Sequence, residues 1–408
     1  MKQFFIIAGI SLMSYATVYA GGFQVSLQGQ KQIGMGHIGV PMLFGASSIY
    51  FNPGALPMLK TKFSANAGVS FISSNVAFQN KTTNYTTNTE NPMGTPLELY
   101  ANYILKDKIS VGLGIYTPFG SAVQWEDDWE GRYLIQKIQL RSFFIQPTVG
   151  YKVLDNLGIG VGFVYCTGNV GITRALPLPV GNSEEYTELS GKASGVGANI
   201  GVHFSPVEKL NLGLTFKTKI NMKAEDQEAT FSVPNSLAEN FPATNKFSTE
   251  LPLPGSINFG ASYLLTEKLT LALEMNFVQW SAYDSLNFDF ETNTAGLPDS
   301  KNPRHYQNTM SLRLGADYKI NDNISARAGA YYDPSPVPDN YFSPETPNSN
   351  NLGLSCGASY VIMEKLSIDA SFLYIMGLER ESYYVPSNFG GSYKGSAVVP
   401  GIGITYQF

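Results

Sequence analysis

The sequence predicts an all-β protein: a transmembrane antiparallel β-barrel of about 14 strands, with an N-terminal hatch that plugs the lumen. Three observations predict this fold. The chain begins with a segment typical of export, short polar turns alternate with long polar loops, and apolar residues occupy every second position between them. Charged residues make up only 14 % of the chain, against about a quarter in soluble domains. A barrel with one face in lipid tolerates few charges.

The N-terminus carries the signal for export. Lys2 precedes an uncharged apolar run, residues 4–13, and small residues stand at Val18 and Ala20. The run is too short for a membrane helix, which needs about 20 residues. We therefore expect residues 1–20 to be a cleaved signal peptide. The alternative is a retained membrane anchor.

Six short polar turns recur along the chain, and each is followed by an apolar residue, a small residue and a second apolar or small residue. The turns are Lys106-Asp107-Lys108, Leu154-Asp155-Asn156, Val207-Glu208-Lys209, Thr266-Glu267-Lys268, Asn321-Asp322-Asn323 and Met363-Glu364-Lys365. Long stretches rich in Asn, Thr, Ser and Pro lie between them, including 79–96, 225–248, 291–303 and 334–350. Short turns on one side and long loops on the other are typical of outer-membrane barrels. Six turns and seven loops connect 14 strands over residues 61–408; one missed or spurious hairpin would change this to 12 or 16.

Side chains alternate between the two faces of a strand, so parity predicts which residues face lipid. On 311–320 the even positions face lipid: Leu312, Leu314, Ala316, Tyr318 and Ile320. The lumenal charged residues by the same rule are Arg313, Asp317, Lys319, Lys217, Lys219, Glu274, Arg327 and Asp369. A basic residue on the lipid face costs about 2–4 kcal/mol at the midplane, which enforces this parity.

Parity also places the cysteines and the C-terminus. Cys166 falls on the lumenal face and Cys356 on the lipid face of a distant strand, so we expect no disulfide. The last strand ends in alternating apolar residues with Tyr406 and Phe408, which we expect in the interfacial aromatic girdle.

A barrel of this size is too wide for wall side chains to fill. Residues 21–60 are rich in Gly and apolar side chains and lack the alternation of a strand. We therefore place 21–60 inside the lumen as a hatch.

Several short segments, in this order, resemble the FadL/TodX family of outer-membrane transporters over essentially the full mature length. They are Gly21-Gly22-Phe23-Gln24, Asn52-Pro53-Gly54-Ala55-Leu56, Tyr116-Thr117-Pro118-Phe119-Gly120, Trp129-Glu130-Gly131-Arg132-Tyr133, Gln146-Pro147-Thr148, Val278-Gln279-Trp280-Ser281-Ala282-Tyr283-Asp284 and the run 327–339. The resemblance implies a 14-stranded barrel with a hatch in the outer membrane of a Gram-negative bacterium. It also implies uptake of long-chain fatty acids or other apolar molecules, with lateral release where the third strand kinks.

Two positions depart from the family pattern. Gly54 replaces an alanine, which would loosen the hatch turn. Asn348-Ser349-Asn350 stands where the resemblance leads us to expect an Asp-rich element ending in Arg.

The sequence shows no catalytic constellation. The three histidines, His37, His203 and His305, are scattered and none has metal-ligand spacing. We therefore expect neither an enzyme nor a cofactor or metal. A net charge of −5 gives no basic surface for nucleic acid. The expected partners are an apolar ligand, outer-membrane lipid and the barrel assembly machinery, with the protein itself a monomer.

Apolar residues in the long loops suggest a ligand-binding surface. They are Leu176–Val180 in one loop and Leu237, Phe241 and Phe247 in another, where Ser236 would cap a short helix through Asn240. The alternative is that these loops only pack on each other. With Phe23 at the mature start, Leu237 and Phe241 complete the apolar part of the predicted site.

The polar part of the predicted site is a lumenal basic residue. Lys217, Arg313 or Arg327 would pair the carboxylate of a ligand, because a desolvated carboxylate needs a partner. The alternative is an ion-pair network with Glu274, Asp317 and Asp369.

Pro118, Phe119 and Gly120 mark the predicted exit. A strand proline belongs at an edge or bulge because it cannot donate a backbone hydrogen bond. We expect the hatch turn Asn52-Pro53-Gly54 to cover the resulting gap. The alternative is that the strand has already left the membrane at Pro118.

The resemblance, together with these features, implies a passive channel for long-chain fatty acids. A channel for aromatic hydrocarbons would use the same fold. An aqueous porin or a surface adhesin barrel would belong to a different class, and the apolar hatch segment argues against the porin.

Overall fold

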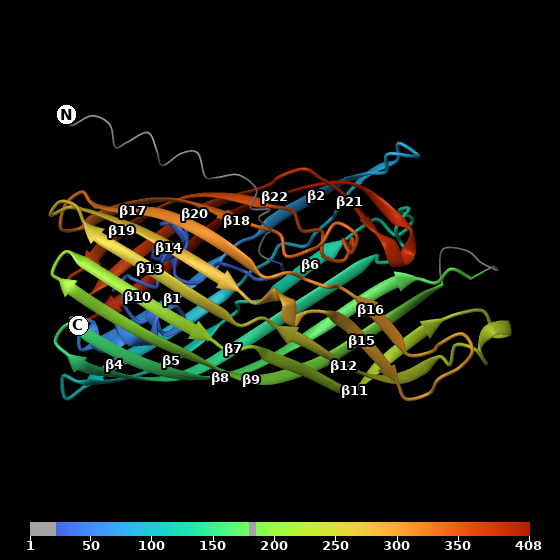
Figure 1. Ribbon diagram of the computed structural model, residues 1–408, viewed down its shortest axis with the longest axis horizontal. Helices are drawn as coiled ribbons and strands as arrows, with labels where there is room; N and C mark the ends of the chain where they lie inside the picture. The colour runs from blue at the N-terminus through green and yellow to red at the C-terminus, as the bar shows by residue number, and fades with distance from the viewer. Residues whose placement is uncertain (1–21, 179–184) are drawn as a thin grey trace, which may run out of the picture.

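The computed structural model describes residues 22–178 and 185–408, which form one closed β-barrel with a hatch inside it (Figure 1). The predicted signal peptide, residues 1–20, lies outside the described residues. Within the described ranges, no helix has the length and apolar character needed to cross a membrane.

Fourteen strands form the wall, and seven of them are continuous. The continuous strands are β4 (Leu97–Leu105), β7 (Lys137–Leu154), β8 (Leu157–Ala175), β9 (Tyr186–Val207), β18 (Ile324–Asp333), β19 (Asn351–Met363) and β22 (Phe389–Gln407). The other seven are each broken into two segments. These are β1/β2 (Phe63–Ser70, Ser73–Gln79), β5/β6 (Ile109–Tyr116, Gly120–Gln124), β10/β11 (Leu210–Lys217, Ile220–Ser232), β12/β13 (Thr244–Leu253, Ser256–Leu264), β14/β15 (Leu269–Val278, Ser285–Phe290), β16/β17 (Ser300–Pro303, Thr309–Lys319) and β20/β21 (Leu366–Gly377, Arg380–Tyr384). A short β3 (Thr86–Asn88) pairs only with β2.

Every wall strand pairs antiparallel with its sequence neighbours, and the ring closes between the first and the last. The order is β1–β4–β5–β7–β8–β9–β10–β13–β14–β17–β18–β19–β20–β22, and β22 pairs back to β1. Closure leaves no unpaired edge in lipid. The predicted barrel and its strand count are confirmed.

All six predicted short turns join consecutive strands at one end of the barrel, the end that also holds the C-terminus (Figure 1). The loops at the other end are shorter than the sequence predicts. β11 and β12 extend into 225–248 and leave only 233–243 as a connection, which contains the 3₁₀ helix η2 (Asn235–Leu237). Polar composition indicated loops there, but these strand ends project beyond the membrane, where both faces can be polar.

Burial follows the predicted parity on most strands. On β17, Leu312, Leu314 and Tyr318 are exposed on the outer face, while Arg313 and Asp317 are buried on the lumenal face. Glu274, Arg327, Asp369 and Lys217 also lie on the lumenal side. Tyr406 and Phe408 are exposed at the predicted girdle, with ring centroids 5.8 Å apart.

The prediction for Lys219 is wrong. Thr218 and Lys219 interrupt the strand between β10 and β11, and the parity of the strand changes across them. Lys219 is therefore exposed on the outer face. Lys319, the last residue of β17, is exposed beside the periplasmic turn.

The hatch fills the lower lumen with three short helices: α1 (Gln30–Ile33), α2 (Ser48–Phe51) and η1 (Pro53–Met58). Most of residues 22–59 are buried. The hatch backbone lies directly on the wall, and lumen-facing glycines make room for it. A Cβ added to Gly213 would lie 2.2 Å from the Val40 carbonyl oxygen.

Two further 3₁₀ helices lie in the extracellular half: η3 (Trp280–Ala282), which follows β14, and η4 (Val385–Ser387), which precedes β22. The helix expected after Ser236 is only η2, which has Pro234 as N-cap and no side-chain cap. The prediction of a Ser236 cap is therefore wrong, because the proline takes that position. Phe247, expected in a loop, is buried on β12.

The two cysteines differ sharply in accessibility. Cys166 is buried in the lumen and Cys356 is exposed on the outer face, and both are free thiols. In detergent we expect an apolar maleimide to label Cys356 within minutes and Cys166 only after non-reducing denaturation. Mass spectrometry of the labelled protein measures both sites. A disulfide-linked product, or rapid labelling of native Cys166, would contradict this arrangement.

Candidate functional site

The break in the third strand is covered by the start of the described chain. Residues 22–27, here called the N-terminal strip, run beside the break between β5 and β6. The Val25 amide donates to the Pro118 carbonyl at 2.8 Å, and the Gly120 amide donates to the Phe23 carbonyl at 3.2 Å. Gln24 and Phe119 form an isolated antiparallel bridge. The strip therefore replaces the strand partners that the wall loses at Pro118.

Aromatic side chains hold the tip of the strip. The Phe23 ring lies 5.0 Å from Trp280, 5.5 Å from Tyr283 and 6.0 Å from Phe119, measured between centroids. Gly22 has φ +57°, and a Cβ there would lie 2.4 Å from Trp280. The Asn348 side chain donates to the Gly22 carbonyl at 2.8 Å. Three distant parts of the chain thus hold the tip of the strip in place, at Phe119, at Trp280 with Tyr283, and at Asn348.

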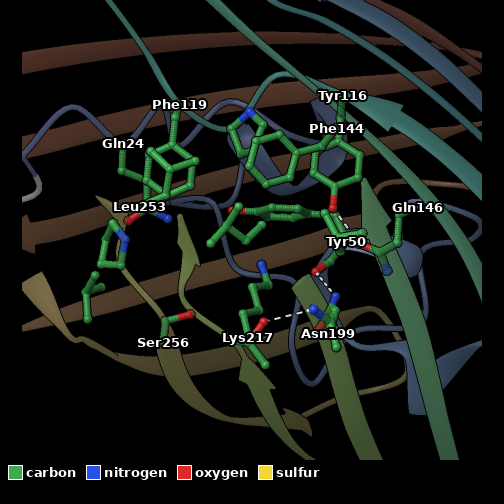
Figure 2. A pocket seen from close by; sticks show the side chains of 17 residues that line it. Gln24, Tyr50, Tyr116, Phe119, Phe144, Gln146, Asn199, Lys217, Leu253 and Ser256 are labelled. Atoms are coloured by element: carbon green, nitrogen blue, oxygen red, sulfur yellow. Dashed lines mark hydrogen bonds between the residues drawn. The ribbon is translucent and has the colours of Figure 1, made fainter. Parts of the chain in front are cut away.

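Below Phe23 lies a small cavity of about 40 Å³, shown in Figure 2. Its lining is mostly aromatic and aliphatic, and Lys217 supplies the ammonium group. The Lys217 Nζ lies 3.3 Å from the centroid of the Tyr50 ring, over which it points (Figure 2). A cation over an aromatic face is stabilised by the ring quadrupole. Burial raises the pKa of the Tyr50 phenol to about 12, so this ring stays neutral.

Two further cavities meet at the strip. One of about 500 Å³ opens beside Phe23, Gln24 and Phe119. The other, about 50 Å³, lies among apolar side chains of the extracellular half and is also lined by Phe23. Gln24 and Phe119 line the cavity of Figure 2 as well. Displacement of Phe23 and Gln24 would therefore join three separate spaces into one passage.

A polar chamber lies on the hatch side of Lys217. Arg313 donates to the Gly36 carbonyl at 3.4 Å and to Ser26 Oγ at 3.3 Å. Glu274 accepts the amides of Gly39 and Val40 at 2.9 and 2.8 Å. These wall side chains therefore bind the hatch backbone.

Arg327 lies in a separate network at the other side of the hatch. Its Nε is 2.8 Å from Asp317, and its Nη1 donates to Ser359 Oγ at 2.6 Å. Ser359 also bonds Asp369, whose Oδ1 lies 3.8 Å from the hatch residue Lys31. Arg327 thus has the ion-pair environment given as the alternative to ligand binding.

The hatch turn sits away from the strand break. The Asn52 side chain accepts the Gly54 amide at 3.0 Å and donates to the Val40 and Val202 carbonyls at 2.9 and 3.0 Å. A Cβ on Gly54 would lie 2.6 Å from the Gly201 carbonyl oxygen. Glycine permits this close contact, so it fits the turn tightly against β8 and β9. The expected cover over Pro118 is supplied by the N-terminal strip instead.

Leu237 and Phe241 are not near Phe23. They lie at the extracellular tip formed by β11 and β12, where Phe241 is 6.2 Å from Phe231 between centroids. In the loop that follows β8, Leu176 is partly buried against the apolar core that also contains Phe231. Pro179 and Val180 of this loop lie outside the described residues. The structure therefore groups Phe23 and Lys217 with Pro118 to Gly120, places Arg313 in the adjoining chamber and leaves the loop residues apart.

Several residues of the site were missed by the sequence reasoning. Gln24 and Trp280 lie in segments that carry the family resemblance, and Tyr50 lies in the predicted hatch. No periodicity of the sequence marks any of the three as a site residue. At the 348–350 segment, Arg380 from β21 supplies a guanidinium, which donates to Ser335 Oγ at 3.0 Å and to the Asn348 carbonyl at 3.1 Å. An arginine arriving from another strand leaves no local sequence signal.

His37 is a titratable group of the hatch. It is buried in the polar chamber, and its Nε2 accepts the Gln28 amide at 3.2 Å. Burial, with the nearby Arg313 and Lys217 charges, holds the pKa of His37 well below its usual range. The closed hatch therefore holds neutral His37, while an opened hatch binds a proton below about pH 6.5.

We expect hatch stability to be full well above pH 6.5 and to fall below it, with a slope that approaches about 1.4 kcal/mol per pH unit until the closed-state pKa is reached. Hydrogen exchange of residues 28–40, corrected for intrinsic rates, should accelerate roughly fivefold between pH 6.5 and pH 5.5. His37→Gln, which keeps an acceptor but cannot titrate, is the control. The same acceleration in this variant would show that another group is responsible.

Comparison with known proteins places this geometry in context. A family model described as outer membrane protein transport protein (OMPP1/FadL/TodX) matches residues 11–408. Outer membrane protein P1 of Haemophilus influenzae is 24 % identical, over 92 % of this chain and 91 % of its own length. A long-chain fatty acid transport protein of Escherichia coli O6:H1 is 21 % identical, over 88 % of this chain and 87 % of its own.

Solved structures share the fold. The crystal structure of a Pseudomonas aeruginosa FadL homologue superposes with a TM-score of 0.83 at 19 % identity, covering 95 % of this chain and all (100 %) of that one. The Ralstonia pickettii toluene transporter TbuX superposes with a TM-score of 0.73 at 18 % identity, covering 93 % of this chain and 98 % of that one.

Proposed function

Because the chain belongs to the OMPP1/FadL/TodX family of outer-membrane transport proteins, we propose that it is a passive channel for long-chain fatty acids. The observation that carries this proposal is the position of Lys217. It offers a buried ammonium in a cavity whose other walls are largely apolar, and three cavities meet at the strip above it. A carboxylate with a long apolar tail has this distribution of charge.

The proposed path begins at the extracellular end and passes Phe23. The cavity of Figure 2 is about 40 Å³, far smaller than an acyl chain, so the ligand has to displace the N-terminal strip to enter. Displacement breaks the contacts of Val25 and Gly120 across the Pro118 break. The same event that admits the ligand thus uncovers a gap in the wall, through which the ligand leaves sideways toward lipid.

A second candidate is an aromatic hydrocarbon. The cavity above Phe23 favours it, because its lining is almost wholly apolar and has no charged side chain. The TbuX likeness, named as a toluene transporter, is compatible with that ligand class. Ligand charge distinguishes the two candidates.

Lys217→Met should weaken binding of hexadecanoic acid by roughly tenfold to a hundredfold, since a hydrogen bond to a charged group contributes about 1.5–3 kcal/mol. Hexadecanol and toluene, which carry no charge, should bind as they do to the wild type. Tryptophan fluorescence titration of the purified barrel measures all three, because Trp280 lies beside Phe23. Lys394→Met, at an exposed lysine on the outer face of β22, is the matched control. Equal losses for acid and alcohol would show that Lys217 does not bind the carboxylate.

A tether across the strand break should block uptake. Gln24 and Phe119 are opposite each other without direct hydrogen bonds, and Cα atoms in such antiparallel pairs are about 4.5 Å apart, within disulfide range. In a background with Cys166 and Cys356 changed to alanine, Gln24→Cys with Phe119→Cys should lose most fatty-acid uptake in liposomes when oxidised. Reduction should restore it.

Each single-cysteine variant, treated with the same oxidant and reductant, controls for loss of the Phe119 ring and for the reagents. If the oxidised double variant transports as fast as the reduced one, the strip does not move during uptake. The lateral route would then be excluded.

A further inference from the structure

An outward-facing groove lies where β10 gives way to β11. Its volume is about 430 Å³, and it is lined by Tyr165, Ser194, Gly195, Val196, Lys219, Asn221 and Lys223. None of these side chains belongs to the predicted ligand path. The groove therefore needs a separate explanation.

A change of strand parity brings two lysines to this face. Below the break, Thr215 and Lys217 face the lumen; above it, Ile220, Met222 and Ala224 are buried on the lumenal side. The inward positions thus pass from odd to even numbers. Lys219 and Lys223, both odd, point outward from the same strand.

The groove lies at the upper edge of the apolar belt. Tyr165 pairs with Val196 across β8 and β9, and both are exposed, at 41 % and 58 %. Two residues farther toward the extracellular end, Thr167 pairs with Ser194, which in turn pairs with Lys223. The outer surface changes there from apolar to polar, and Lys223 lies on the polar side, where Glu225 and Glu250 are also exposed. Lys219 lies level with the Tyr165–Val196 pair, because its neighbour Thr218 donates to the Ala198 carbonyl, and its long side chain can extend toward the headgroups.

The two ammonium groups are available to a ligand. Neither Lys219 nor Lys223 forms an ion pair with any residue in the described ranges. Glu250 is opposite Lys223 in the β11–β12 ladder and is also exposed. It does not approach within the 4.0 Å of an ion pair, so Lys223 remains free to bind an anion.

Asn221 lies in the groove between Lys219 and Lys223 in the chain. Its side-chain oxygen is buried and has no hydrogen-bond partner among the residues that the structure describes. Beside Asn221 the regular pairing with β9 is interrupted. It stops at the pair Lys217 and Asn199 on β10 and resumes at the pair Lys223 and Ser194 on β11. An unsatisfied buried polar atom is costly, and an external hydroxyl or amide donor would satisfy it.

We propose that this groove binds lipid A, the phosphorylated and acylated glucosamine disaccharide of the outer leaflet. Lys219 and Lys223 bind a phosphate through charge-assisted hydrogen bonds, Asn221 accepts from a sugar hydroxyl or amide, and Tyr165 and Val196 contact an acyl chain. The groove has Lys223 above the apolar pair and Lys219 beside it, an arrangement that matches such a lipid in its membrane orientation. Its role is to fix one lipid against the wall beside Lys217.

The test measures retention of lipid A by the full mature barrel in detergent micelles, by native mass spectrometry during titration with bisphosphorylated lipid A. The wild type should bind one molecule in preference to phosphate-free lipid A. Lys219→Gln with Lys223→Gln should reduce that affinity by roughly tenfold or more, since each basic residue near an anionic lipid surface contributes to binding. Asn221→Ala should weaken both lipids.

Lys394→Gln is the matched control. Lys394 is an exposed lysine on β22, half-way around the ring, and lies just above the apolar residues of that strand. The Lys394→Gln substitution should leave lipid A binding unchanged, and thermal melting should show that all variants fold. The proposal is overturned if the double variant binds lipid A like the wild type, if Lys394→Gln loses as much, or if phosphate-free lipid A binds equally well. A dimer that the double variant abolishes would instead assign the groove to a second copy of the chain.

Discussion

The whole structure depends on one constraint: within lipid, each backbone donor and acceptor must find its partner inside the protein. Thirteen neighbouring pairings and the β1–β22 closure meet it almost everywhere. One of the interruptions is in the third strand at Pro118, between β5 and β6. There the amide and carbonyl groups of the N-terminal strip take over, through Val25 and Phe23. The gap in the wall there is thus covered by a segment of the hatch.

The rest of the hatch is held much more firmly than this strip. Three wall carboxylates bind it: Glu98 contacts the Gly29 amide, Glu274 binds two hatch amides, and Asp369 lies near Lys31. Buried charged acceptors lose these partners at high free-energy cost. The strip is held by the aromatic contacts of Phe23 and by hydrogen bonds between neutral groups at Pro118, Gly120 and Asn348, and only its Ser26 bonds a charged wall side chain, Arg313. Motion is therefore easier at residues 22–27 than in the remainder of the hatch.

The face of the barrel wall on which a side chain lies could be predicted from the sequence where a single physical rule determines it. Strand parity placed Arg313 and Asp317 in the lumen, because a charge in lipid is costly. The same alternation of side chains placed Cys356 on the outer face. It failed at Lys219, since an interruption of two residues changes the parity and composition does not reveal its position. From the sequence, the hatch turn Asn52-Pro53-Gly54 was expected to cover Pro118, whereas the N-terminal strip covers it. Which segment pairs with a strand break depends on three-dimensional proximity, and the strip has no alternation that would indicate pairing.

The unequal anchoring of the hatch has a consequence for the route of transport. A straight route to the periplasm would require the hatch to leave the lumen, and with it the contacts of Glu98, Glu274 and Asp369. A lateral route requires only that Phe23 and Gln24 leave the break. Because hydrogen bonds to buried charged groups each contribute about 1.5–3 kcal/mol, the first route is the more costly by several such bonds. Binding an apolar ligand in place of Phe23 also offsets the aromatic contacts that the strip loses, which no ligand below the hatch would do. The unequal anchoring of the hatch therefore supports the proposed exit through the wall over one through the plug.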